Sequence, residues 1–166
     1  MTDHMDAWEQ MQEMELKYGT NLGAFLLAFN YVESTLYQLV REILISQKLE
    51  RFAEVCAPRK VDDAIRQLRA LNEDLFPSHE INLEAAQQLA QFRNRVAHGK
   101  YQDHVRVNFD THKLECGFEI QSTRNRNSTN VTIEALEENT LIAEKLLNQL
   151  IAVSILLKEA STIESV

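Results

Sequence analysis

Hydrophobic residues recur every three or four positions over most of the chain, the spacing that places them on one face of an α-helix. Residues 21–49 show this most clearly, with one apolar stripe formed by Leu22, Phe25, Leu26, Phe29, Val32, Leu36, Leu39, Val40 and Ile43. A shorter stretch over residues 4–18 ends before Gly19, a residue type that commonly follows a helix. We therefore predict two N-terminal helices, the second capped by Thr20 or Asn21.

Three later segments have the same spacing. Residues 61–76 precede Pro77, residues 82–99 begin with the potential cap Asn82 and end at Gly99, and residues 132–162 form a long last segment. The predicted buried residues of the last segment are Ile133, Leu136, Leu147, Leu150, Ile151 and Leu157. Together these patterns predict a mainly α protein, a bundle of about five helices.

The period changes to two between the fourth and fifth helical segments. Apolar residues alternate at Val105, Val107 and Phe109, and again from Leu114 to Ile120, with Asp110-Thr-His between the two runs. This pattern predicts an inserted β-hairpin at about residues 104–121. Residues 122–130 are polar and aperiodic, which predicts a mobile loop.

Composition is consistent with one domain covering residues 1–166. The chain is 45% hydrophobic, with four glycines and two prolines, enough apolar material for a sizeable helical core. We see neither a secretory signal nor the roughly 18 consecutive apolar residues that span a bilayer, and we expect a cytoplasmic protein with no membrane partner. In that compartment Cys56 and Cys116 are expected to be free thiols.

The distribution of charge bears on possible partners. The net charge is −8, which is unfavourable for general binding of polyanions. Residues 92–126, however, carry a net charge of +3, against −11 for the rest of the chain. This basic segment could attract RNA to one place, although a solvated hairpin of mixed charge explains the same count.

The segment Phe92-Arg-Asn-Arg-Val-Ala-His-Gly99 carries the chemistry of interest. Histidine exchanges protons near neutral pH, arginine pairs with phosphate oxygens through its planar fork, and an amide orients either group. Asn94 and His98 are four residues apart and share a helix face, whereas Arg93 and His98 point about 140° apart. Arginine and histidine also occur together in the last turn of ordinary helices, where cations favour the negative end of the macrodipole.

Arg93, Asn94 and His98 resemble the motif of the HEPN superfamily, in which an arginine, usually followed by a polar residue, precedes a histidine by four to six intervening residues. The specific part of the resemblance is only these six residues, 93–98. It implies an antiparallel helical bundle in which the motif faces a homodimer interface, so that two copies form one composite cleft. It also implies metal-independent endoribonuclease activity without a cofactor, typical of toxins and defence effectors.

The resemblance implies a role for each motif residue. His98 would transfer protons, Arg93 would stabilise the charge on the phosphorane, and Asn94 would orient His98 or the phosphate. Arg95, Lys100 and Tyr101 are candidates for binding the RNA substrate. Toxins of the family that are paired with an antitoxin often have a tyrosine two residues after the histidine; here Lys100 stands there and Tyr101 follows it.

Glu33 is a candidate supporting residue because it lies within the apolar stripe, between Phe29 and Leu36. An unpaired carboxylate is costly there, and Arg93 or Arg95 is the partner we expect. Alternatively, Glu33 lies at the edge of the stripe and reaches water.

Other chemistries fit the sequence less well. The spacing of His98, His104, His112 and Cys116 matches no familiar zinc pattern, so no metal is expected, and no glycine-rich phosphate loop is present. Two hypotheses of function remain. One is the HEPN-type ribonuclease; the other is a catalytically silent helical module for interaction or regulation.

Overall fold

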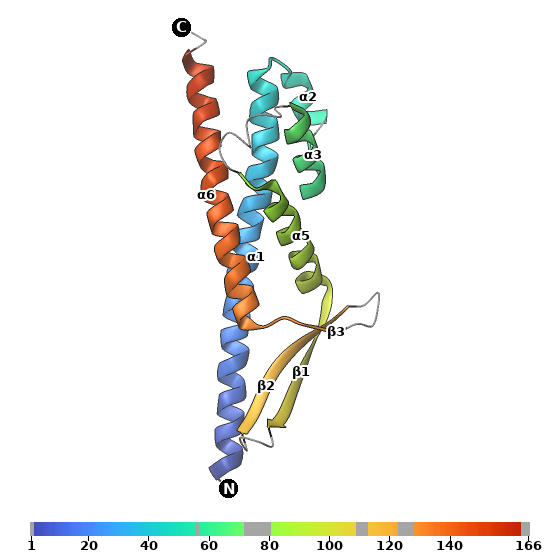
Figure 1. Ribbon diagram of the computed structural model, residues 1–166, viewed down its shortest axis with the longest axis vertical. Coiled ribbons are helices and arrows are strands. Elements are labelled where there is room, and N and C mark those ends of the chain that lie inside the picture. Colours follow the sequence, from blue (N-terminus) through green and yellow to red (C-terminus); the bar gives the residue numbers. More distant parts are fainter. Residues whose placement is uncertain (1, 56, 72–80, 109–112, 123–127, 164–166) are drawn as a thin grey trace. The chain divides into compact units, whose positions relative to one another are not determined.

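The computed structural model describes residues 2–55, 57–71, 81–108, 113–122 and 128–163 (Figure 1). Side chains are described for residues 8–49, 51–53, 57–71, 81–98 and 131–159. The described part of the chain is mainly helical, as the sequence predicts. In chain order its elements are α1 (Thr2–Ser46), α2 (Glu50–Val55), α3 (Val61–Leu71), α5 (Leu83–His98), β1 (Gly99–Asn108), β2 (Lys113–Ser122), β3 (Ser128–Asn130) and α6 (Ile133–Ile163).

The N-terminal region forms one helix, so the prediction of two helices divided at Gly19 is wrong. Thr20 and Asn21 do not cap a new helix, because their side chains donate hydrogen bonds back to the carbonyls of Leu16 (2.8 Å) and Lys17 (3.0 Å) one turn earlier. Glycine weakens a helix interior by only about 1 kcal/mol relative to alanine. The burial of Tyr18 before Gly19 and of Phe25 after it outweighs that cost.

α1 ends at Ser46 through a Schellman motif, three residues before the end we predicted. The amide of Leu49 donates to the carbonyl of Leu44 at 2.8 Å, and that of Lys48 to Ile45 at 2.9 Å. Lys48 has a φ of 59°, a left-handed conformation that glycine usually supplies at this position. Without a glycine, the sequence contained no signal for this end, and the short helix α2 that follows was not predicted.

The cap predicted for α5 is present, and α6 has a cap that was not predicted. Asn82 Oδ1 accepts a hydrogen bond from the amide of Ala85 at 3.3 Å before α5, and Thr132 Oγ1 accepts one from Ala135 at 3.1 Å before α6. α3 begins at Val61 as expected. The part of its predicted range beyond residue 71 lies outside the described residues.

Three strands follow α5 in one antiparallel sheet of order β1-β2-β3. The register of the first pair runs from Gly99 opposite Ser122 to Asn108 opposite Lys113. β3 pairs with β2 within the region predicted to be a loop, with Thr129 opposite Ile120. The connection at residues 109–112 lies outside the described residues, and the inserted hairpin therefore stays a prediction.

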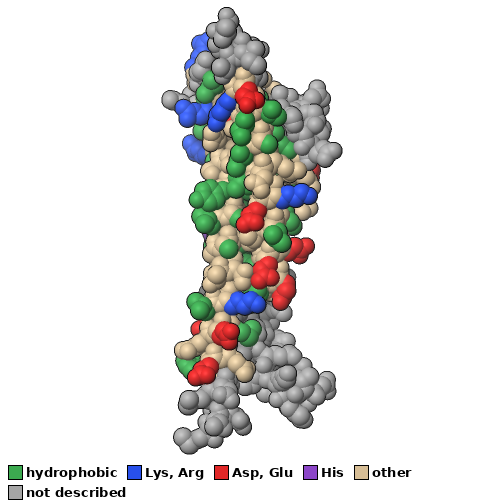
Figure 2. Space-filling model, turned by 90° about the vertical axis from the view of Figure 1, so that its left-hand side faces the viewer, with side chains coloured by type: hydrophobic (Ala, Val, Ile, Leu, Met, Phe, Trp, Pro, Cys, Tyr) green, Lys and Arg blue, Asp and Glu red, His purple; other side chains and the backbone are tan. Residues whose placement is uncertain are grey.

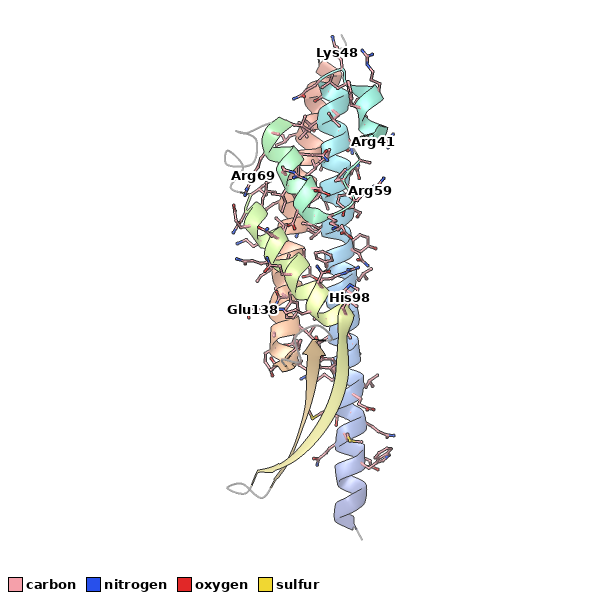
Figure 3. The ribbon with its side chains drawn as sticks, turned by 90° about the vertical axis from the view of Figure 1, so that its right-hand side faces the viewer. Arg41, Lys48, Arg59, Arg69, His98 and Glu138 are labelled. Carbon is pink, nitrogen blue, oxygen red and sulfur yellow. The ribbon has the colours of Figure 1, made fainter. Side chains whose placement is uncertain are left out.

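The chain divides into two compact units, and α1, α5 and α6 contribute residues to both. Unit 1 contains residues 1–26 and 91–139, and unit 2 contains residues 27–90 and 140–166. The largest fully buried side chains of unit 1 are Phe25, Val96 and Leu136; those of unit 2 are Phe29, Val32, Leu36, Leu39, Val40, Ile43, Leu68, Leu89 and Leu150. Within unit 2, α1 and α6 run parallel and α5 runs opposite to both (Figures 1 and 3). Of these three helices, α5 therefore has the expected antiparallel arrangement with the other two, but α1 and α6 do not have it with each other.

One predicted core residue of α6 is not in the core. Ile151 is 42% exposed, whereas Leu150 beside it is fully buried. Leu141, Ile155 and Leu156 are also exposed, at 66%, 51% and 45%. α6 therefore carries apolar residues on its outer side as well as its inner side, and spacing alone could not tell the two sides apart.

Candidate functional site

The motif occupies the last turns of α5, which stays helical through His98 before β1 begins at Gly99. Figure 3 shows His98 at this junction between helix and strand. Because the helix does not end before His98, the angular spacing of an α-helix applies to all three motif residues.

Apolar residues fix the inner side of this helix end in unit 1. Phe92 is 6% exposed and Val96 is fully buried. The ring of Phe92 meets that of Phe25 edge to face, with centroids 4.9 Å apart and planes at 81°. Such pairs add stability beyond the burial of their area. This contact with α1 sets which side of α5 faces solvent.

The polar residues lie on the remaining sides of the helix. Asn94, Arg95 and His98 are exposed, and Arg93 is half-buried. Arg93 Nη1 donates to Asn94 Oδ1 at 3.3 Å, and the Arg95 guanidinium lies 5.5 Å from the centroid of the Phe92 ring. Each arginine is thus in contact with a neighbour on α5, and Asn94 and His98 occupy the side opposite the core.

Arg93 and His98 point in different directions. At 100° per residue their side chains diverge by about 140°, while Asn94 and His98 diverge by about 40°. A phosphate held by Asn94 and His98 of one helix would lie away from the Arg93 of that helix. The geometry of one chain therefore assembles the amide and the imidazole, and leaves the arginine to one side.

The position of these cations also has a purely structural explanation. Arg95 and His98 are the basic residues of the last turn of α5, where positive charge is favoured by the helix dipole. Exposed imidazole, amide and guanidinium groups are equally what an RNA phosphate would contact. The type and the exposure of these groups are therefore compatible with phosphodiester binding as well as with stabilisation of the helix end. A measurement of RNA cleavage distinguishes the two explanations.

The other predicted site residues lie on β1 and α1. Lys100 and Tyr101 lie in β1, opposite Gln121 and Ile120, but their side chains are outside the described ones. Glu33, in unit 2, is half-buried and accepts a hydrogen bond from the hydroxyl of Tyr37 at 2.9 Å, one turn along α1. A polar partner for Glu33 is thus found on its own helix, while its pairing with Arg93 or Arg95 stays a prediction.

A polar cluster in unit 2, centred on Glu42, was not predicted from the sequence. Glu42 Oε1 accepts a hydrogen bond from Gln38 at 2.8 Å and pairs with Lys158 Nζ at 3.0 Å, while Oε2 accepts from the buried hydroxyl of Ser154 at 2.7 Å. Burial raises the pKa of Glu42, but the hydrogen bonds from Ser154, Lys158 and Gln38, with the charge of Lys158, outweigh it and hold the pKa below its ordinary value. Nothing in the sequence relates residues so far apart in the chain.

Two findings concern metals and membranes. Among the side chains described, no group of three or more His, Cys, Asp or Glu residues is placed to hold a metal ion. His104, His112 and Cys116 lie outside that set. Among the described residues one helix, α6 from Ile133 to Glu159, is long and apolar enough to cross a membrane by length and composition. Those two properties are shared by core helices of globular proteins.

No protein-family model, curated protein or solved structure matches the chain.

Proposed function

We propose that the chain is a metal-independent endoribonuclease of HEPN type that acts as a toxin or defence effector. The observation that carries the proposal is the motif itself. Asn94 and His98 share the solvent side of a helix end whose opposite side is anchored by Phe92 and Val96. Arg93 donates a hydrogen bond to Asn94. A separately encoded antitoxin or regulatory protein belongs to the same proposal.

The reaction uses the substrate's own nucleophile. The 2′-hydroxyl oxygen bonds to the adjacent phosphorus, its proton passes to a base, and the bond from phosphorus to the 5′-oxygen breaks. The leaving oxygen takes a proton, which gives a 2′,3′-cyclic phosphate and a 5′-hydroxyl end. His98 serves in proton transfer, Arg93 stabilises the phosphorane charge and Asn94 orients the phosphate. No metal or cofactor takes part.

Two copies of the motif complete the site. Because Arg93 and His98 of one α5 diverge by about 140°, the Arg93 that serves a given His98 comes from a second chain. The active species is then a homodimer with a composite cleft. The basic segment 92–126, with a net charge of +3, supplies the attraction for RNA, and Arg95, Lys100 and Tyr101 are its nearest candidates for contact.

The first test is cleavage of total RNA and short labelled RNAs in EDTA by the wild type and H98A. We expect the wild type alone to produce cyclic phosphate ends, with a loss of about 100-fold or more in H98A because general acid-base catalysis disappears. Q91A is the matched control, since Gln91 is an exposed residue of α5 outside the motif, and it should cleave like the wild type. Equal cleavage by wild type and H98A would reject the proposal.

Mixing two inactive variants tests the composite site. A heterodimer of R93A and H98A retains one intact pair, with Arg93 from one chain and His98 from the other. We expect the mixture to recover part of the wild-type rate, although each variant alone is inactive. A mixture as inactive as its components would place Arg93 and His98 of the same chain in one site.

The alternative function is a catalytically silent module for interaction. It is favoured by the outer side of α6, where Leu141, Ile151 and Ile155 are exposed. On this hypothesis purified wild type does not cleave RNA, and replacing Arg93 lowers stability. Specific cleavage by the wild type would eliminate it.

A further inference from the structure

The outer side of α6 in unit 2 has an ordered pattern that the proposed cleavage site does not use. Three rows of exposed residues run along it, and members of a row are seven positions apart. Such a row drifts by only about 20° per step on an α-helix, so each row stays on one line. The central row is Leu141, Asn148 and Ile155; the flanking rows are Glu144, Ile151 and Lys158, and Lys145, Ala152 and Glu159.

The middle of this outer face is uncharged and partly apolar. Between Lys145 and Lys158 the three rows contain only Asn148, Ile151, Ala152 and Ile155, and the two isoleucines are 42% and 51% exposed. Figure 2 looks onto the side of the molecule that α6 occupies in Figure 1, and shows hydrophobic side chains gathered along the helix. The inner side of the same helix is already covered, with Leu146, Leu150 and Val153 buried.

The charges at the two ends of this face are arranged for self-pairing. The flanking row with Glu144 ends in Lys158, and the row with Lys145 ends in Glu159, so each row carries opposite charges at its two ends. When a second α6 lies antiparallel across a two-fold axis, each row lies beside the same row of the second copy. The two rows run in opposite directions, so the start of one is beside the end of the other. Glu144 then meets Lys158 of the second copy, and Lys145 meets Glu159.

We propose that the outer face of α6 binds the same face of a second copy of this chain, antiparallel, with the two-fold axis between Ile151 and Ala152. In that register Ile151 packs on its own copy, Ala152 on its own copy, and Asn148 beside Ile155. Four flanking ion pairs align the two copies along their length, as charged flanking positions do in helix pairs generally, and the helix dipoles favour the antiparallel direction.

This inference does not depend on RNA cleavage. Self-association is measured in the absence of RNA, and cleavage is measured separately. A dimer without nuclease activity supports the interface and rejects the proposed function. A monomer that cleaves RNA rejects the interface and the composite site, but keeps the endoribonuclease activity.

The test is sedimentation velocity and equilibrium of the full chain at micromolar concentrations. We expect a wild-type dimer whose dissociation constant rises about tenfold or more in I155D, because a charge is placed in the centre of the face. L16D is the matched control, since Leu16 lies on α1 and is 73% exposed, and it should leave the dimer unchanged. Helix content measured by circular dichroism verifies that each variant is folded.

Charge exchange tests the antiparallel register. K145E and E159K should each weaken the dimer, because each places like charges together, and the double variant K145E/E159K should restore it. In a parallel pair Lys145 would instead meet Glu144, and Glu159 would meet Lys158, so the double variant would stay weak. We vary Lys145 and Glu159 because Lys158 also pairs with Glu42 at 3.0 Å.

Three results would overturn the proposal. A wild type that is monomeric throughout the concentration range excludes self-pairing. A dimer that I155D leaves intact uses another surface. A monomer that floats with phosphatidylcholine vesicles, and loses this property in I155D, would assign the face to lipid.

Discussion

At the scale of single residues, the Glu42 carboxylate has three polar partners among the described side chains. Its two oxygens accept hydrogen bonds from Gln38 and from the buried hydroxyl of Ser154 on α6, and one of them pairs with the ammonium of Lys158. These contacts join α1 to α6 within unit 2. They also discriminate between the ionised and protonated forms of the carboxyl group, because the ionised form accepts all three.

Replacing Ser154 by alanine should lower the free energy of unfolding at neutral pH by about 1 kcal/mol, since Glu42 Oε2 loses a donor at 2.7 Å. Urea unfolding measures this change. S34A is the control, because Ser34 is exposed and its hydroxyl bonds only to the carbonyl of Tyr31 on the same helix. An equal loss in both variants would mean that the contact with Glu42 has no special weight.

The same variant should alter the acid limb of stability. The pKa of folded Glu42 lies below its ordinary value of 4.5, so this carboxylate stabilises the fold above that pH. The contribution is lost as pH falls through the folded pKa. Without the Ser154 hydrogen bond the folded pKa rises toward the ordinary value, and the difference in stability between wild type and S154A should shrink below about pH 4. A difference that stays constant with pH would contradict this link.

At the scale of elements, α1 shows how a continuous apolar stripe dominates a local break signal. Gly19 lies in the interior of the helix, and an added Cβ there would have no neighbour within 4 Å. Its backbone is helical, so alanine fits without strain. Among the described residues, Gly19 thus costs stability without a compensating contact.

Replacing Gly19 by alanine should raise the free energy of unfolding by about 0.5–1 kcal/mol, because alanine loses less backbone entropy on folding. Thermal and urea unfolding measure the gain. G23A should behave in the same way, since Gly23 is also helical and open. A loss of stability in G19A would indicate that the chain turns at Gly19, as the sequence alone suggested.

Features of the fold that depend on local hydrogen bonds could be predicted from the sequence, whereas those that depend on unusual backbone conformations or on tertiary packing could not. Asn82 caps α5 as expected, because a cap is a local hydrogen bond within three residues. The end of α1 was missed because Lys48 takes a left-handed conformation that its residue type does not announce. The exposure of Ile151 was missed because a helix with two apolar sides gives no single stripe.

The candidate site was predictable in part for the same reason. Spacing places Asn94 and His98 on one side of α5, and the buried residues Phe92 and Val96 confirm that this side faces solvent. The partner found for Glu33 is Tyr37, one turn away on the same helix. The cluster around Glu42 depends instead on tertiary contacts with Ser154 and Lys158. No period in the sequence encodes contacts between residues on different helices.

At the scale of the whole molecule, three helices cross the division between the two compact units. Unit 1 includes the N-terminal part of α1 and the C-terminal part of α5, and unit 2 includes the rest of each. A helix gains its stability cooperatively along its length, so loss of one part lowers the stability of the other. The expectation of a single domain over residues 1–166 therefore means that the two units unfold together, and this cooperativity can be measured.

Replacing Phe92 by alanine removes the aromatic contact with Phe25 in unit 1 and should cost about 3–5 kcal/mol. If the chain unfolds as one domain, hydrogen exchange of the most protected amides should accelerate by the same factor in both units, including those near Leu36 and Leu39 in unit 2. L68A is the reciprocal variant, since Leu68 is fully buried in unit 2, and it should accelerate exchange in unit 1. Acceleration confined to the mutated unit in both variants would show that the units unfold independently. The Arg93–His98 motif would then belong to a smaller folding unit than the chain as a whole.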